Sequence, residues 1–154
     1  MVLGAAFPAA FLESQIRRQL VPGAVIKLRQ VMDDGVVHEK RFVVLHVQDD
    51  TVTCVINSHI SAFLSNRPAM LKCQVNMTAA SHSFMHHDSH VDCSRTRTYK
   101  TADVVRELVA QPDWMLGSIA KDLRGNMIAA LKFAPTLSPS EVERLCAALA
   151  PADS

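Results

Sequence analysis

In residues 40–58, KRFVVLHVQDDTVTCVINS, hydrophobic side chains occur at both the even-numbered and the odd-numbered positions. In a strand these two sets of positions point to opposite faces. Two short runs rich in β-branched residues flank a polar stretch at 48–51. Such runs around a polar turn are typical of an antiparallel hairpin, and apolar residues on both sets indicate the centre of a sheet. We therefore expect the rest of the chain to be built around this hairpin.

The position of the turn determines which residues of the hairpin face each other. A turn centred on 49–50 places Val43 opposite Ile56 and Arg41 opposite Ser58. Directly opposed residues in an antiparallel pair have Cβ atoms about 5 Å apart. The pattern thus predicts a cation and a hydroxyl side by side at the open end of the hairpin. A slip of one residue would turn Ser58 to the other face.

Further strands are predicted on both sides of the hairpin. Residues 24–32 are strand-like, Asp-Asp-Gly at 33–35 is a turn signal, and 36–39 leads into the hairpin, which gives a meander of three strands. Residues 70–77 alternate between apolar and polar side chains and indicate a half-buried strand, and 89–94 indicate a short one.

The first residues, MVLGAAFPAAFL, are apolar but lack the basic start of a signal peptide and run into the charged ESQIRRQ. We therefore expect no secretion signal. No uncharged run approaches the ~20 residues that span a bilayer. Instead, residues 9–20 predict a short helix with Phe11, Leu12, Ile16 and Leu20 on one stripe.

The last third of the chain changes to helical spacing. We expect one helix over 102–110 with Thr101 as its N-cap, and another over 120–133. The clearest helix start is Ser-Pro-Ser-Glu at 138–141, with serine at the N-cap, proline at N1 and glutamate at N3. This motif predicts a final helix that begins directly after Ser138.

Together these elements predict a single α+β domain over 1–154, whose core is a small curled sheet or barrel of about five strands. Its parts are an N-terminal helical extension at 1–21, a barrel part at 22–100 and C-terminal helices at 101–150. With 154 residues, 49% of them hydrophobic, the chain is long enough to bury a sizeable core.

The formal net charge of +1 excludes a global polybasic attraction to nucleic acid or membrane, so any such binding must rest on a local patch. The four cysteines are Cys54, Cys73, Cys93 and Cys146, and none forms a C-x-x-C pair. Three of them lie in expected strands. We interpret all four as reduced core thiols of a cytoplasmic protein.

Four of the seven histidines lie in residues 81–93, SHSFMHHDSHVDC. Imidazole and thiolate suit zinc, and the candidate ligands are His86, His87, His90 and Cys93. Because His90 and Cys93 would point to opposite faces of a strand, we expect no metal here. A histidine such as His87 can instead act as a general base near neutral pH. The alternative is a structural turn held by Asp88 and Ser89.

Residues 94–100, SRTRTYK, place Arg95, Arg97 and Tyr99 on one face. Two guanidinium groups beside an aromatic ring suit a phosphate backbone and a stacked base, and the alternative is a solvated strand edge. The sequence has no nucleophile elbow, phosphate-binding glycine loop, H-E-x-x-H or dinucleotide fingerprint. This excludes the common hydrolase, kinase and dehydrogenase classes.

The order of several motifs resembles the MazF/PemK/Kid toxin family. PGAVIKL at 22–28, KRFVVL at 40–45 and VINS at 55–58 are similar to its P-G-D-[IV] strand, its K-x-R-P-[AV]-V-V strand and its short hydroxyl-bearing motif. HDSHVDCSR at 87–95 and LGSIAKDLRGNMIAAL at 116–131 fit its later part, so the resemblance covers residues 22–134.

The resemblance implies an SH3-like barrel, usually a homodimer, that cleaves single-stranded RNA without a metal or other cofactor and is held off by a cognate antitoxin. The family's catalytic arginine falls on Arg41 and its catalytic threonine or serine on Ser58. A guanidinium can stabilise the negative charge that forms when a 2′-hydroxyl attacks phosphorus, and a hydroxyl can position a phosphate oxygen. We add His87 as the acid–base candidate, with His59 as the alternative. The side chains expected to bind the RNA are Arg95, Arg97 and His59.

The chain departs from the family pattern at Ala24, Phe42 and Asn57, where the family has an acidic residue, a proline and part of its threonine motif. The competing hypothesis is a non-enzymatic SH3-like module that binds a protein or nucleic-acid partner. Convergence of Arg41, Ser58 and His87 in one groove would favour the nuclease, whereas scattered positions would favour the module.

Overall fold

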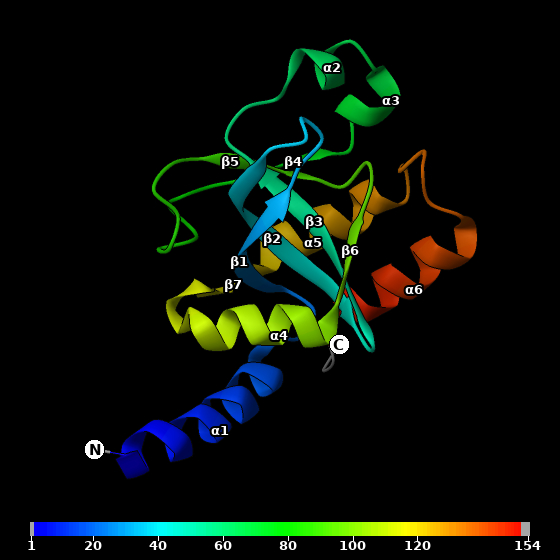
Figure 1. Cartoon of the computed structure of the whole chain (residues 1–154). Helices are drawn as coiled ribbons and strands as arrows, with labels where there is room; N and C mark the ends of the chain where they lie inside the picture. Colours follow the sequence, from blue (N-terminus) through cyan, green and yellow to red (C-terminus); the bar gives the residue numbers. More distant parts are fainter. Residues whose placement is uncertain (1, 152–154) are drawn as a thin grey trace.

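The computed structural model describes residues 2–151, with side chains from residue 9 onward. Within these residues a seven-stranded antiparallel sheet curls into a half-barrel (Figure 1). Its strand order is β4-β5-β3-β2-β1-β7, and β6 pairs with β3. The strands are β1 (Ala24–Val31), β2 (Val37–Val47), β3 (Asp50–Asn57), β4 (Gln74–Met77), β5 (Ser89–Asp92), β6 (Arg97–Lys100) and β7 (Met115–Ser118).

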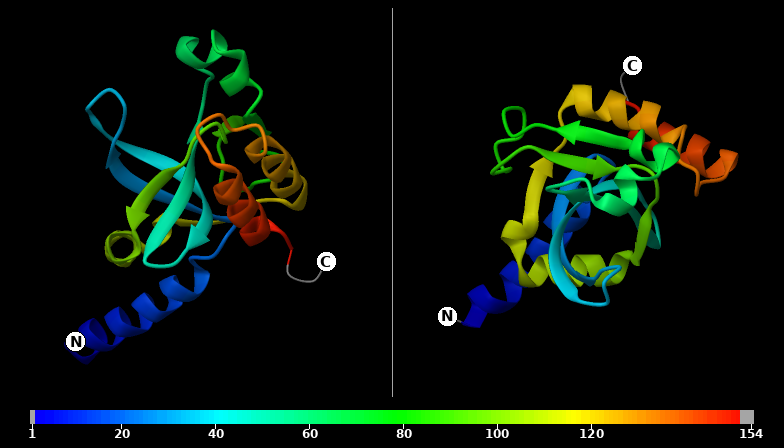
Figure 2. Two further views of the ribbon diagram at one scale, coloured as in Figure 1. Left: turned by 90° about the vertical axis from the view of Figure 1, so that its right-hand side faces the viewer. Right: turned by 90° about the horizontal axis from the view of Figure 1, so that it is seen from above.

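Helices cover both sides of the curled sheet. They are α1 (Val2–Gln19), α2 (Ala62–Ser65), α3 (Pro68–Leu71), α4 (Thr101–Ala110), the 3-10 turn η1 (Pro112–Trp114), α5 (Lys121–Leu131) and α6 (Pro139–Leu149). Figure 2 shows α5 and α6 together on one side, and α4 on the other, with α1 projecting past α4. The prediction of an α+β fold with a curled sheet between an N-terminal helix and C-terminal helices is confirmed. No helix in the described part of the chain is long and apolar enough to cross a bilayer.

The central strands are apolar on both sets of positions because each set packs into a separate core. One set of β1–β3 residues, including Val43, packs beneath α5 and α6 with Met127 and Leu145. The other set, including Phe42, packs against α4 and the end of α1. Strands buried on both faces read as continuous hydrophobic runs. The prediction that residues 40–58 form the centre of the sheet is therefore confirmed.

The predicted register of the β2–β3 hairpin is wrong by two residues at its open end. Arg41 pairs with Ile56, not with Ser58, and Val43 pairs with Cys54. Val47 pairs with Thr51 across a loop of odd length, and an irregularity between Val44 and His46 adds a second one-residue shift. A shift of one residue reverses the faces and a shift of two restores them. Ser58 therefore follows Ile56 on Arg41's face, as a diagonal neighbour.

Several predicted segment boundaries also change. Residues 70–77 do not form one strand, because α3 occupies the beginning and only Gln74–Met77 pairs with β5. Pro68 begins that helix, where its fixed φ and missing N–H are tolerated. Cys73 therefore lies one residue before β4, and Cys93 lies one residue after β5, because β5 ends at Asp92 and not at residue 94. Both cysteines are buried and free, as is Cys54. The strand β7 was not predicted.

Two predicted helix features are wrong, and each has a packing reason. Thr101 is not an N-cap, because its hydroxyl donates to the Gln48 carbonyl at 2.6 Å and contacts the Thr51 hydroxyl at 2.8 Å. It fastens α4 to the tip of the β2–β3 hairpin instead. Ile16 of α1 and Leu20 directly after it are buried as expected, but Phe11 is 56% exposed, because the buried contacts of this segment are made at its C-terminal end, where α1 packs against α4.

The start of α6 matches its sequence signature. The Ser138 hydroxyl accepts from the Glu141 N–H at 3.2 Å, and the Glu141 carboxylate accepts from the Ser138 N–H at 3.0 Å. The bond from the Ser138 N–H to the carboxylate is the main cause that lowers the pKa of Glu141, and the Ser138 side chain lowers it further. Replacement of a capping serine costs about 1 kcal/mol. We expect Ser138→Ala to lower the free energy of unfolding by about 1 kcal/mol in urea denaturation, and Ser138→Asn, which keeps an acceptor, to change it by less than about half of that.

The contribution of Glu141 has a defined pH dependence. Because its folded pKa lies below its unfolded value, the stabilisation is complete above the unfolded pKa and is lost as the pH falls through the folded pKa. The stability difference between wild type and Glu141→Gln should therefore shrink as the pH falls from about 6 to about 3. A constant difference over that range would show that the carboxylate contributes no stabilisation through its charge.

Candidate functional site

A cavity of about 220 Å³ opens where the β2–β3 hairpin emerges from the core, on the side of the sheet covered by α5 and α6. We call it the Arg41 cavity. Its lining consists of Lys27, Glu39, Lys40, Arg41, Ile56, Ser58, Met85, His87 and Ser89. The structure thus brings together Arg41, Ser58 and His87, although Arg41 and Ser58 are diagonal rather than opposite.

The guanidinium group of Arg41 is available for an anionic ligand. Its Nη1 contacts the sulfur of Met85 at 3.9 Å, and a thioether is a weak acceptor. No carboxylate of residues 9–151 lies within ion-pair distance of it. The acidic residue of the cavity, Glu39, instead binds Lys27 at 3.2 Å and Arg29 at 3.1 Å. The bond from Arg29 and, to a smaller extent, the bond from Lys27 lower the pKa of Glu39. The Glu39 carboxylate therefore stays ionised and paired with these two cations.

Lys27 was missed in the sequence, although the turn at 33–35 could have revealed it. The β1–β2 pairing places Lys27 directly opposite Arg41. The lining of the Arg41 cavity thus holds three cations, Lys27, Lys40 and Arg41, against the single carboxylate of Glu39, so it has an excess of positive charge. Such a cavity favours a phosphate.

His87 lies in the β4–β5 loop at the rim of the Arg41 cavity. Its Nδ1 is 3.0 Å from the Asp88 carbonyl and 3.3 Å from the Ser89 hydroxyl. A carbonyl can only accept, so it requires the proton on Nδ1, and the lone pair of the neutral ring is then on Nε2. In this tautomer Nε2 can accept a proton from a substrate hydroxyl.

The loop that carries His87 is held by two contacts that the sequence did not reveal. The buried ring of His82 bonds the Thr78 carbonyl at 2.8 Å through Nδ1 and accepts from the Ala120 N–H at 2.9 Å through Nε2. The ring of Phe84 covers Gly117 so closely that a Cβ there would lie 2.7 Å from it. These contacts join the loop to β7 and to the start of α5. The loop in turn places Met85 against Arg41 and His87 in the lining of the Arg41 cavity.

The three residues predicted to bind RNA lie in a second cavity, which we call the Arg97 cavity. It measures about 750 Å³ and lies between the tip of the β1–β2 hairpin and α2. Its lining includes His59, Arg95, Arg97, Lys40, Asn57 and Phe63. His59 therefore lies outside the Arg41 cavity, so of the two acid–base candidates His87 alone is beside Arg41.

Arg95 and Arg97 are already paired within the protein. Both guanidinium groups bind Asp33 from the tip of the β1–β2 hairpin, Arg97 at 2.7 Å. The hydrogen bond from Arg97 lowers the pKa of Asp33, which keeps that carboxylate charged. Tyr99 packs edge-on against Phe42 with ring centroids 5.6 Å apart, so it is not an exposed stacking platform. The predicted arginine–arginine–tyrosine surface is therefore not free as the sequence pattern suggested.

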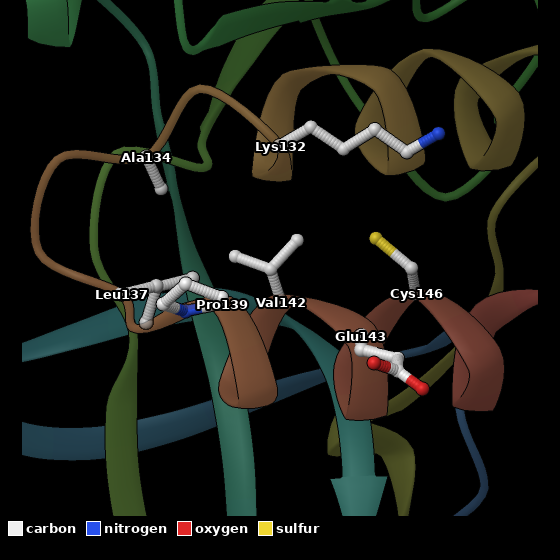
Figure 3. Close-up of a pocket in the computed structure, with 7 residues that line it drawn as sticks. All are labelled: Lys132, Ala134, Leu137, Pro139, Val142, Glu143 and Cys146. Carbon is white, nitrogen blue, oxygen red and sulfur yellow. The ribbon is translucent and has the colours of Figure 1, made fainter.

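A third cavity, of about 530 Å³, lies between α5 and α6 (Figure 3). Val142 and Cys146 point from α6 toward α5, and Leu137 and Pro139 close one end. Burial raises the pKa of Cys146, which keeps this thiol protonated near neutral pH. The lining is mainly apolar, and the titratable side chains in it are those of Lys132, Glu143 and Cys146.

The zinc candidates do not converge. Cys93 is buried in the core, His86 and His87 are exposed on the loop, and His90 contacts the Asn76 side chain at 3.1 Å. In the part of the chain that the structure describes, no group of three or more histidine, cysteine or acidic side chains is arranged to hold a metal ion.

No protein-family model matches this chain, and comparison with curated proteins finds no significant match.

The contacts of His82 give a testable consequence. Its removal leaves the Ala120 N–H and the Thr78 carbonyl without their partner, and an unmade buried hydrogen bond costs about 1–3 kcal/mol. We expect His82→Ala to lower the free energy of unfolding by about 2 kcal/mol in urea denaturation. The matched control is His86→Ala in the same loop, an exposed ring whose loss should cost less than about 0.5 kcal/mol. Equal effects of the two variants would show that the His82 contacts do not hold the loop.

Proposed function

We propose that this protein is a metal-independent endoribonuclease of the MazF/PemK/Kid type that cleaves single-stranded RNA. The observation that supports this best is the grouping of Arg41, Ser58 and His87 around one cavity with a net positive lining. These are the three side chains to which the sequence analysis assigned the chemistry. Arg41 comes from β2, Ser58 directly follows β3, and His87 lies in the β4–β5 loop. A scattered arrangement would have favoured a binding module.

In the proposed reaction the 2′-hydroxyl of one nucleotide attacks its own 3′-phosphorus. His87 takes the proton from that hydroxyl at Nε2 as the new oxygen–phosphorus bond forms. Arg41 stabilises the extra negative charge on the non-bridging oxygens, and the Ser58 hydroxyl donates to one of them. The bond to the 5′-oxygen then breaks, and this oxygen takes a proton from a water molecule. The hydroxide that remains takes back the proton held on Nε2 of His87, so the ring returns to its neutral form. The products are a 2′,3′-cyclic phosphate and a 5′-hydroxyl.

We further propose an oligomeric state, a protein partner and a location for this chain. The proposal includes a second copy of the chain as a homodimer partner, a cognate antitoxin protein that blocks the cavity, and a cytoplasmic location. The homodimer and the antitoxin follow from the family resemblance of residues 22–134, and the cytoplasmic location follows from the interpretation of the four cysteines as reduced thiols. The experiment below tests the chemistry itself.

The experiment is cleavage of an end-labelled, mixed-sequence single-stranded RNA by purified wild type and Arg41→Ala, with and without EDTA. Loss of a group that stabilises transition-state charge costs about 10²–10³ in rate. We expect cutting to be unchanged by EDTA and reduced at least about 100-fold in Arg41→Ala. Ser58→Ala and His87→Ala should each be slower than wild type, and the products should carry a 2′,3′-cyclic phosphate.

A matched control is Arg106→Ala, because Arg106 is an exposed arginine of α4 paired with Asp103. It should cleave like wild type. Cutting that EDTA abolishes would assign the chemistry to a metal. Folded wild-type protein that leaves the RNA intact would overturn the proposal and favour the binding module.

A further inference from the structure

Lys40 lies at the junction of the two polar cavities. Among the described residues it alone lines both the Arg41 cavity and the Arg97 cavity. The side chain is half-buried, and its Nζ donates to the Asn57 side-chain oxygen at 2.9 Å. An ammonium group has three donors, so two remain for another acceptor.

The charges around Lys40 are not balanced by the protein. No carboxylate of residues 9–151 lies within ion-pair distance of its Nζ. Burial and, to a smaller extent, the nearby Arg97 lower the pKa of Lys40, as expected for an ammonium group with no carboxylate beside it. A half-buried cation without a partner is a place where an anionic ligand is stabilised.

The acidic residues of the Arg97 cavity do not supply that anion, because each is engaged elsewhere. Asp33 binds Arg95 and Arg97, and Asp34 contacts His38 at 2.8 Å. The buried Asp92 accepts from the Gln74 amide at 2.8 Å and from the Ser94 N–H at 3.0 Å.

Lys40 and Arg41 are consecutive residues of β2, so their side chains leave opposite faces of the strand. At the end of the sheet where β2 and β3 emerge from the core, Arg41 lines the Arg41 cavity alone, whereas Lys40 also lines the Arg97 cavity. A single strand of RNA that crosses this end passes from one cation to the other. We infer that Lys40 binds the phosphate next to the one held at Arg41, and that the Arg97 cavity accepts the nucleotide attached to it.

The lining of the Arg97 cavity suits a base as well as a phosphate. Phe63 is 50% exposed there, with the Arg67 guanidinium stacked 3.6 Å from its ring centroid. Single-stranded bases stack on aromatic rings and on guanidinium planes. Asn57, His59 and Ser61 offer hydrogen-bonding groups for a base edge.

This inference rests on the proposed function, so its test uses a strand that cannot be cut. A fluorescently labelled 2′-fluoro RNA lacks the attacking hydroxyl, and its dissociation constant is measured by anisotropy across a range of salt concentrations. Lys40→Gln should weaken binding about tenfold. It should also reduce the slope of log K against log salt by about 0.7, the value for one phosphate contact. Lys40→Arg keeps the charge and should retain the wild-type slope.

Two matched controls separate this contact from general effects of charge and aromatic area. Lys100→Gln removes an exposed lysine that pairs with Asp50, at the opposite end of β3, and should leave the slope unchanged. Phe63→Ala should weaken binding about tenfold through lost stacking. Phe133→Ala, which removes an equally exposed ring beside Lys72, should leave binding unchanged.

The outcomes distinguish this inference from the proposed function. Cleavage of ordinary RNA by wild type, with equal slopes for Lys40→Gln and Lys100→Gln, would overturn the Lys40 contact alone. Binding of 2′-fluoro RNA with the expected slopes, but no cleavage of ordinary RNA, would overturn the nuclease alone. For a contact used in binding, Lys40→Gln should raise KM and leave kcat within about threefold of wild type.

Discussion

Burial of the β2–β3 hairpin on both faces is the constraint on which the arrangement of the site depends. Phe42, Val43, Val44 and Leu45 are completely buried, alternately under α4 and under α5 and α6. Ionised side chains cannot be accommodated along such strands without partners, since burying a charge is costly. Polar chemistry is therefore confined to the end where the strands emerge. Consecutive side chains there, Lys40 and Arg41, leave opposite faces of β2 because the strand still alternates.

The register of the same hairpin decides which polar groups meet. Two one-residue shifts, one in the loop and one at the irregularity between Val44 and His46, together preserve the facing of every side chain at the open end. Arg41 and Ser58 remain on one face for this reason. Arg41 and Ser58 do not need to be directly opposite each other. It is enough that they lie on the same face, because diagonal neighbours can still reach a shared ligand.

The free and the occupied cations are distinguished by the carboxylates that other segments provide. Asp33, at the tip of the β1–β2 hairpin, neutralises Arg95 and Arg97, while Glu39 is taken by Lys27 and Arg29. Arg41 and Lys40 are left without a carboxylate among the described residues. An anionic strand would therefore be recognised along the end of β2 rather than along β6. The β4–β5 loop, fastened by His82 and Phe84, adds a histidine to this place.

The sequence by itself determined the local and periodic features. The doubly apolar hairpin, the three-stranded meander and the capping box of α6 all depend on neighbours within a few residues, and each was predicted correctly. The identity of Arg41, Ser58 and His87 as candidates came from residue chemistry and a family resemblance.

Tertiary structure alone decided the rest. The bond of Thr101 to the Gln48 carbonyl, the pairing of Arg95 and Arg97 with Asp33, and the bond between His82 and Ala120 all join residues that lie far apart in the chain. Such contacts exist only when the whole chain has packed, because no local pattern specifies which distant carboxylate, carbonyl or amide a side chain will meet.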